Sequence, residues 1–191
     1  ALEESAKVLE NLLHQNPGLA PGWVALGVAQ ARMHREDDAI ASFQKAVTLS
    51  PSDGYARKNL GAILARNEKL ADAIEHLRKA IEILQHDSQA WLNFGMALEQ
   101  SDEGSQADLA YQKVLRLDPN GEIGKLAEEG LTRIAASSFR KQNAGIRPDA
   151  MSYCLGALQR FHEMPRAEVQ KITFEAAMLG SRGLDVNDPA E

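Results

Sequence analysis

Large and small residues along this chain follow the spacing of amphipathic helices, in paired segments separated by polar turns. Residues 21–34 and 37–50 each carry one stripe at helical spacing. The stripes consist of Trp23, Leu26, Gly27 and Gln30 in the first segment and Ala39, Phe43, Ala46 and Val47 in the second. This pattern predicts two helices that pack against each other as an antiparallel pair.

The same arrangement of residues returns twice more with a constant period of 34 residues. The matching positions are Trp23, Leu26, Gly27, Ala39, Phe43, Ala46 and Pro51, then Arg57, Leu60, Gly61, Ala73, Leu77, Ala80 and Gln85, then Trp91, Phe94, Gly95, Ala107, Tyr111, Val114 and Pro119. Glycine inside a helix costs about 1 kcal/mol relative to alanine. Its recurrence at one place therefore predicts that the two helices of each pair approach closely there.

The motif W-x2-L-G, followed by A-x3-F/Y, a small residue and a proline, resembles the tetratricopeptide repeat family over residues 1–138. The second copy departs from this motif at Arg57, Leu77 and Gln85. The resemblance implies an all-α fold, in which antiparallel helix pairs stack into a right-handed superhelical solenoid. It also implies that the first helix of each pair lines a concave face.

The register divides this part of the chain into units. We expect the second helix of a truncated repeat over residues 1–19, repeats over 20–53, 54–87 and 88–121, and a capping helix over 122–138. The motif is lost in the capping helix, where Lys125 stands one period after Trp91.

Residues 139–191 resemble no family. The polar segment from Phe139 to Arg147 predicts a linker, two amphipathic stretches over about 148–183 predict a helical hairpin, and the last residues predict a mobile tail. The chain starts within a repeat and stops without a cap. We therefore expect it to be part of a longer protein.

Helical geometry predicts which side chains reach the concave face. They are Val24, Val28 and Arg32 from the first repeat, Tyr55, Lys58, Asn59 and Arg66 from the second, and Gln89, Leu92, Asn93 and Met96 from the third. The predicted groove is apolar at its start, amide-rich and basic in the middle, and apolar and acidic at its end, where Glu99 also faces it.

Asn59 and Asn93 occupy the same place in successive repeats, and a carboxamide can both donate and accept a hydrogen bond. This resembles the asparagine ladder of some family members, which holds extended peptides, although solvated asparagines are the alternative interpretation. A basic clamp for a C-terminal carboxylate is not expected. Val24 and Val28 stand where that device needs Lys and Asn.

Composition and candidate chemistry exclude several classes of function. A net charge of −6 argues against binding to nucleic acid, and no apolar run is long enough for a membrane span. The single Cys154 lies eight residues from His162 on one predicted helix, too far along the axis for a nucleophile and its base. No catalytic residue, metal site or cofactor is expected, and the lone cysteine favours a reducing, cytoplasmic location.

The sequence thus predicts a non-catalytic scaffold for protein–protein interaction, which binds a peptide or a helix of a partner in its groove. Two alternatives stay open. Residues 148–183 could mediate a homodimer or fill the chain's own groove, or the chain could be the targeting arm of a longer, possibly enzymatic, protein.

Overall fold

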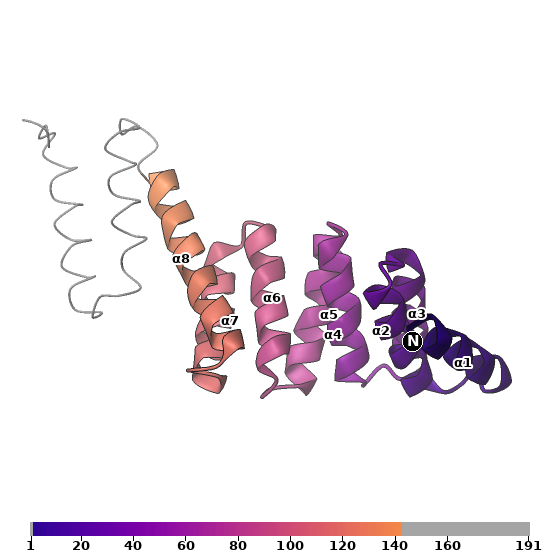
Figure 1. Cartoon of the computed structure of the whole chain (residues 1–191). Helices are drawn as coiled ribbons and strands as arrows, with labels where there is room; N and C mark the ends of the chain where they lie inside the picture. Colours follow the sequence, from indigo (N-terminus) through magenta and orange to yellow (C-terminus); the bar gives the residue numbers. More distant parts are fainter. Residues whose placement is uncertain (1, 143–191) are drawn as a thin grey trace, which may run out of the picture. The chain divides into compact units, whose positions relative to one another are not determined.

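The computed structural model describes residues 2–142, and these residues form eight α-helices without a β-strand. The helices are α1 (Leu2–Gln15), α2 (Ala20–Arg32), α3 (Glu36–Leu49), α4 (Gly54–Arg66), α5 (Leu70–Ile83), α6 (Ser88–Gln100), α7 (Gly104–Leu117) and α8 (Glu122–Gln142) (Figure 1). The predicted all-α fold is confirmed for this part of the chain.

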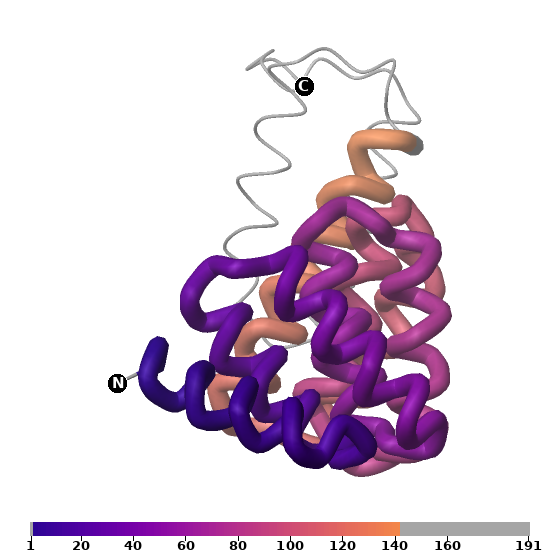
Figure 2. Tube along the Cα trace, turned by 90° about the vertical axis from the view of Figure 1, so that its right-hand side faces the viewer, coloured from indigo at the N-terminus to yellow at the C-terminus, as the bar shows by residue number. Residues whose placement is uncertain are grey.

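Successive helices pack into a linear array. The strongest packing joins α2 to α3, α4 to α5 and α6 to α7, and each pair also contacts the next through α3 with α4 and α5 with α6. Figure 2 looks along this array from the α1 end. We call α2, α4 and α6 the first helices and α3, α5 and α7 the second helices of their pairs. The chain divides into two compact units, Ala1–Leu131 and Thr132–Glu191, and the array belongs to the first unit.

Each pair is held at one point where a glycine of the first helix faces a large side chain of the second. A Cβ atom built on Gly27 would lie 2.7 Å from Phe43 Cε1, and one built on Gly61 would lie 2.5 Å from Leu77 Cγ. A Cβ atom built on Gly95 would lie 2.8 Å from Tyr111 Cε1. A side chain at any of these glycines would therefore push the two helices apart.

The ring of Tyr111 has a second glycine neighbour in α8. A Cβ atom on Gly130 would overlap this ring, so α8 closes onto α7 by the same kind of contact. Gly130 is not in register with the earlier glycines, which is why the period does not reveal it. Tyr111 itself is fully buried, and its hydroxyl donates a hydrogen bond of 2.6 Å to Glu99 Oε2.

Arg57 stands where the motif has tryptophan, but it makes the same hydrogen bond as the tryptophans of the other repeats. Trp23 Nε1 donates to the carbonyl oxygen of Pro17 at 2.9 Å, and Trp91 Nε1 donates to that of Gln85 at 3.1 Å. Arg57 Nε donates to the carbonyl oxygen of Pro51 at 2.7 Å. Each donor thus fastens the start of its helix to the preceding turn, because a guanidinium, like an indole, offers a planar N–H at the end of a long side chain.

The turn inside each pair has a repeating backbone conformation. His34, Glu68 and Asp102 have φ angles of 59°, 59° and 65° and lie one period apart. Around Glu68, the Lys69 N–H donates to the Leu64 carbonyl at 3.0 Å and the Glu68 N–H to the Ala65 carbonyl at 3.1 Å. These bonds form a Schellman motif, in which the left-handed position is normally taken by glycine. Each turn therefore stores backbone strain.

We expect Glu68→Gly to raise the free energy of unfolding by about 0.5–1 kcal/mol, because glycine adopts a positive φ without steric cost. Glu68→Ala is the matched control: it removes the same exposed side chain but keeps a Cβ atom, so it should not stabilise the protein. Urea unfolding followed by circular dichroism measures both changes. Equal effects of Gly and Ala would contradict strain at this turn.

His76 fills a place that Ser42 and Ala110 occupy in the other repeats. Its Nδ1 is the one buried side-chain nitrogen or oxygen atom without a hydrogen-bond partner among the residues that the structure describes. Burial lowers the pKa of His76, and the positive charge of Arg57 lowers it further. The second repeat therefore holds a neutral histidine that resists protonation in the folded state.

This histidine should make the fold sensitive to mild acid. The unfolded chain takes up a proton near the ordinary histidine pKa of about 6.5, whereas the folded protein does so at lower pH, so stability falls as the pH drops below that value. His76→Gln is expected to flatten the decrease in melting temperature between about pH 7 and pH 5. His14→Gln, which removes an exposed histidine, should keep the wild-type profile. Parallel profiles for wild type and His76→Gln would exclude this role.

The end of α8 differs from the expected boundary. The helix continues beyond Ser138 to Gln142 and includes the start of the segment expected to be a linker. Arg140 and Lys141 lie in its last turn, where positive side chains interact favourably with the helix dipole. The helical hairpin, the tail and the dimer contact expected for residues 148–183 lie outside the described residues, as do Cys154 and His162.

Candidate functional site

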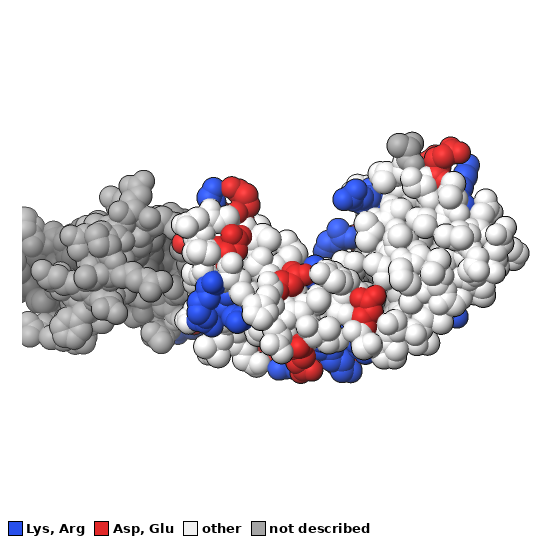
Figure 3. All heavy atoms as spheres, turned by 90° about the horizontal axis from the view of Figure 1, so that it is seen from below, with Lys and Arg blue, Asp and Glu red and all other residues white. Residues whose placement is uncertain are grey.

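The first helices lie on the inner side of the array. Direct contacts join α2 to α4 and α4 to α6, while neighbouring second helices contact each other much less. Closer spacing of one row of helices curves the array toward that row. The space-filling view shows the resulting hollow, with Lys and Arg side chains on its wall (Figure 3).

Most of the predicted groove residues have side chains that a ligand could reach. Arg32, Tyr55, Arg66 and Met96 are exposed, and Val24, Val28, Lys58, Asn59, Gln89 and Asn93 are partly buried. Tyr55 and Met96 are 57% and 42% exposed, although both are large apolar residues. These two side chains are the apolar contact surface that the first helices leave open.

The prediction that Leu92 lines the groove is wrong, because this side chain is only 2% exposed and belongs to the core. Lys58 occupies the corresponding place in α4, and its side chain is only 14% exposed. This repeat position therefore lies in the junction between neighbouring first helices, and a leucine there contributes to stability.

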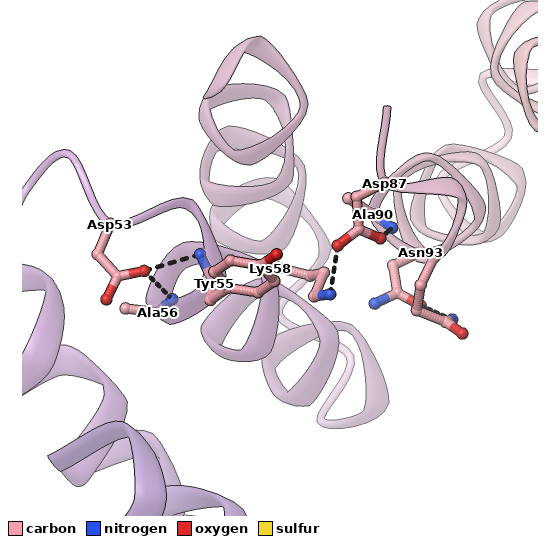
Figure 4. Close-up of polar contacts among 8 residues, drawn as sticks. Asp53, Tyr55, Ala56, Lys58, Asp87, Ala90 and Asn93 are labelled. Atoms are coloured by element: carbon pink, nitrogen blue, oxygen red, sulfur yellow. Dashed lines mark hydrogen bonds and ion pairs between the residues drawn. The ribbon is translucent and has the colours of Figure 1, made fainter. Parts of the chain in front are cut away.

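Lys58 spans this junction from α4 to the beginning of α6. Its Nζ atom lies 2.7 Å from Asp87 Oδ2, with the two side chains 14% and 19% exposed (Figure 4). The same ammonium group lies 4.9 Å from the centroid of the Tyr55 ring. Lys58 is thus engaged by the protein itself, and the role expected for it as a free cation in the groove does not fit this geometry.

Asp87 is also the N-cap residue of α6. Its Oδ1 accepts a hydrogen bond of 2.9 Å from the Ala90 N–H. Burial alone would raise the pKa of Asp87, but the hydrogen bonds from Lys58 and Ala90 hold this pKa below its usual range. Asp53 caps α4 in the same way, with Oδ1 accepting from the N–H groups of Tyr55 and Ala56 at 2.9 and 3.1 Å.

The two asparagines of the possible ladder have different surroundings. Gln89 Nε2 donates a hydrogen bond of 2.9 Å to Asn93 Oδ1, so one end of the Asn93 carboxamide is occupied. Within residues 2–142 the Asn59 side chain makes no hydrogen bond. Asn59 can therefore offer both its donor and its acceptor to a ligand, whereas Asn93 keeps its amide N–H groups.

The basic residues at the ends of the first helices also differ. Arg66 Nη2 lies 3.3 Å from Glu36 Oε1, and Asn67 Nδ2 donates to Glu36 Oε2 at 2.6 Å. Arg32 is exposed at the end of α2, and no ion pair of its side chain is found in the part of the chain that the structure describes. Arg32 is thus the more available cation.

Sequence reasoning missed the two acidic partners, Asp87 and Glu36. The turn before α6 carries an N-cap signal at Asp87, which could have been read from the sequence. Its pairing with Lys58, 29 residues away, could not, since only the packing of adjacent repeats brings them together.

Comparison with known families decides the identity of the array. Residues 2–54, 24–88 and 88–120 match the tetratricopeptide repeat, and together these matches cover more than half of the chain. The chain belongs to the tetratricopeptide repeat family. No curated protein matches the sequence at a significant level.

Several solved tetratricopeptide repeat structures share the fold. The first repeat domain of Spaghetti (RPAP3), bound to the HSP90 peptide SRMEEVD, has 22% identity and a TM-score of 0.58 over 62% of this chain and 91% of its own. YrrB, described as having an unusual peptide-binding site, has 22% identity and a TM-score of 0.64 over 72% and 69%. MamA from Desulfovibrio magneticus has 21% identity and a TM-score of 0.60 over 74% and 88%. These likenesses show the fold alone.

Residues 2–142 contain no group of three His, Cys, Asp or Glu side chains that could hold a metal ion. Among these residues, no helix combines the length and the hydropathy of a membrane-spanning segment.

The ion pair between Lys58 and Asp87 should contribute to the coupling of the second and third tetratricopeptide repeats. Asp87→Ala removes both the cap and the partner of Lys58, and we expect a loss of about 2 kcal/mol or more in the free energy of unfolding. Asp87→Asn keeps a capping oxygen and removes only the charge, so its loss should be smaller, about 1 kcal/mol. Urea unfolding measures both losses.

Asp53→Asn is the matched control, because Asp53 caps α4 at the corresponding repeat position and forms no ion pair within residues 2–142. Its effect should stay within a few tenths of a kcal/mol. If Asp87→Asn and Asp53→Asn had the same effect, the contribution of Lys58 would be absent.

Proposed function

We propose that this chain is a non-catalytic interaction module, which binds a segment of a partner protein along the hollow face of α2, α4 and α6. The observation that carries the proposal is the open contact surface on these helices. Tyr55 and Met96 expose large apolar side chains next to the carboxamides of Asn59 and Asn93. Apolar anchors with nearby backbone-binding amides are what a peptide site requires.

The geometry favours an extended segment over a helix. The amide N–H and carbonyl groups of an extended peptide are free to pair with side chains, whereas those of a helix are already paired. Asn59 has both groups of its carboxamide available, and Asn93 has its N–H groups. The two residues stand one period apart on α4 and α6, so they can hold successive parts of one peptide backbone.

The distribution of positive charge along the first helices predicts the orientation of the bound segment. Arg32 lies exposed on α2, while Lys58 is neutralised by Asp87 and Arg66 is close to Glu36. The uncompensated positive charge is therefore greatest toward α2. An acidic residue of the bound segment would lie at that end, and an apolar residue would meet Met96 at the other.

Related folds support a peptide ligand. The RPAP3 structure contains a bound HSP90 peptide and YrrB is described as having a peptide-binding site, and both have the fold of this chain. The HSP90 peptide itself is not proposed as the ligand, because Val24 and Val28 provide no cationic clamp on α2.

Peptides selected on the full chain from a random library provide the probe for a direct test. We expect Asn59→Ala to weaken binding by about 1 kcal/mol or more, because two hydrogen bonds of its carboxamide would be lost. Asn93→Ala should weaken it less, since its oxygen already bonds Gln89. Isothermal titration calorimetry with the selected peptide measures both changes.

Asn120→Ala supplies the matched control, because Asn120 is an exposed asparagine in the turn between α7 and α8 and is not part of a first helix. Its affinity should equal that of the wild type. An Asn59→Ala, Asn93→Ala double variant with unchanged affinity for the selected peptide would contradict binding through the asparagines.

A further inference from the structure

A second surface of the array, outside the hollow, has the properties of a binding site. A cleft of about 310 Å³ lies along the seam of α6 and α7. Its lining residues are Trp91 and Phe94 from α6 and Gln106, Leu109, Ala110, Lys113 and Arg116 from α7. We call it the α6–α7 cleft.

The α6–α7 cleft lies on a different side of α6 from the groove. Trp91 and Asn93 are two residues apart, which places their side chains about 200° apart around the helix axis. A ligand in the cleft therefore would not compete for the groove residues. The two surfaces can be tested separately.

Leu109 is exposed without a structural need. It is 64% exposed, the highest value among the large hydrophobic residues in the described part of the chain. Ala41 and Glu75 hold the corresponding places on α3 and α5, so the fold accepts a small or a charged residue there. A leucine beside the half-buried Trp91 ring thus provides apolar contact area that packing does not explain.

Positive charges lie beside this apolar floor: Lys113 and Arg116 are among its lining residues, and Arg78, which is not, lies next to Phe94. Lys113 Nζ lies 5.9 Å from the centroid of the Trp91 ring, and the guanidinium of Arg78 lies 5.4 Å from that of the Phe94 ring. Arg116 lines the cleft as well, and none of the lining side chains is acidic. No ion pair neutralises these three cations within residues 2–142.

The positive charge of the α6–α7 cleft belongs to the third repeat, because the equivalent surface of the second repeat is acidic. The positions of Gln106, Leu109 and Arg116 correspond to Asp72, Glu75 and Glu82 on α5. There, Lys79 pairs with Glu75 at 2.6 Å, so its charge is compensated. The same seam is therefore acidic in one repeat and cationic and apolar in the next, although the chain as a whole has a net charge of −6.

We propose that the α6–α7 cleft is a second docking site, which takes a short acidic and apolar segment of a partner protein. Leu109, Trp91 and Phe94 contact its leucine or phenylalanine side chains, and Lys113, Arg116 and Arg78 face its Asp and Glu residues. Charge complementarity selects this occupant, because an apolar peptide alone would leave three cations without counter-charges, and a basic one would be repelled.

The test uses a synthetic peptide of alternating Asp or Glu and Leu or Phe residues, titrated into the ¹⁵N-labelled full chain. The protein contains two tryptophans, and their indole N–H signals report on different places. Trp91 lines the cleft, whereas Trp23 holds the same position in the first repeat. We expect the Trp91 signal to shift on titration while the Trp23 signal stays, and we expect the shift to weaken at high salt.

Leu109→Glu should weaken binding of this peptide at least about tenfold, because a carboxylate there repels the acidic ligand and removes its apolar contact. Ala41→Glu is the matched control, with the same charge change at the corresponding place of the first repeat, and should leave the affinity unchanged. Glu75 occupies this place on α5, so both variants are expected to fold, and circular dichroism checks this. A second variant, Lys113→Gln with Arg116→Gln, should weaken binding and reduce its dependence on salt.

Three results would overturn the proposal. One is the absence of a Trp91 shift with the acidic peptide. Another is equal binding of a peptide whose acidic residues are replaced by Asn and Gln, or by Lys. The third is a shift confined to the groove residues Tyr55, Asn59 and Asn93, which would place the acidic segment in the hollow instead.

Discussion

In each pair, a glycine of the first helix lets a large side chain of the second helix approach its backbone, and this contact sets the spacing of the whole array. Phe43, Leu77 and Tyr111 each press against a glycine of the facing helix, at distances that leave no room for a Cβ atom. Buried alanines on the second helix, among them Ala39, Ala73 and Ala107, have small side chains that allow the same close packing. One residue type at one position thus fixes the distance within each pair, and its repetition at a constant period makes the pairs equivalent.

Because the packing within each pair is the same, the residues on the other faces of the helices can differ between repeats. The packing of the first helices uses buried positions such as Leu60, Leu92 and Leu98, and leaves Tyr55, Asn59 and Met96 for a ligand. Contacts between repeats are more individual. Lys58 and Asp87 couple the second repeat to the third, whereas the corresponding place on α2 holds Val24. The array therefore combines a uniform core with junctions and surfaces that differ from one repeat to the next.

Most of the fold could be predicted from the sequence because its packing residues recur at fixed offsets. The departures within the second repeat could not be interpreted in this way: a sequence pattern does not show that Arg57 makes the hydrogen bond of a tryptophan. The groove was harder to predict. Helical geometry placed Tyr55, Asn59 and Met96 on an open face, but it could not distinguish them from Leu92, whose burial depends on the neighbouring helix. Pairings such as Lys58 with Asp87 depend on contacts between repeats, which no local pattern encodes.

The proposed function requires that partner segments bind to the first helices of the array. Chemical-shift mapping of the full chain with a library-selected peptide tests this most directly, since it reports where the ligand lies without altering the protein. We expect the side-chain amide signals of Asn59 and Asn93 and the methyl signal of Met96 to shift together. Shifts confined to α3, α5 and α7, with these three signals unchanged, would contradict it.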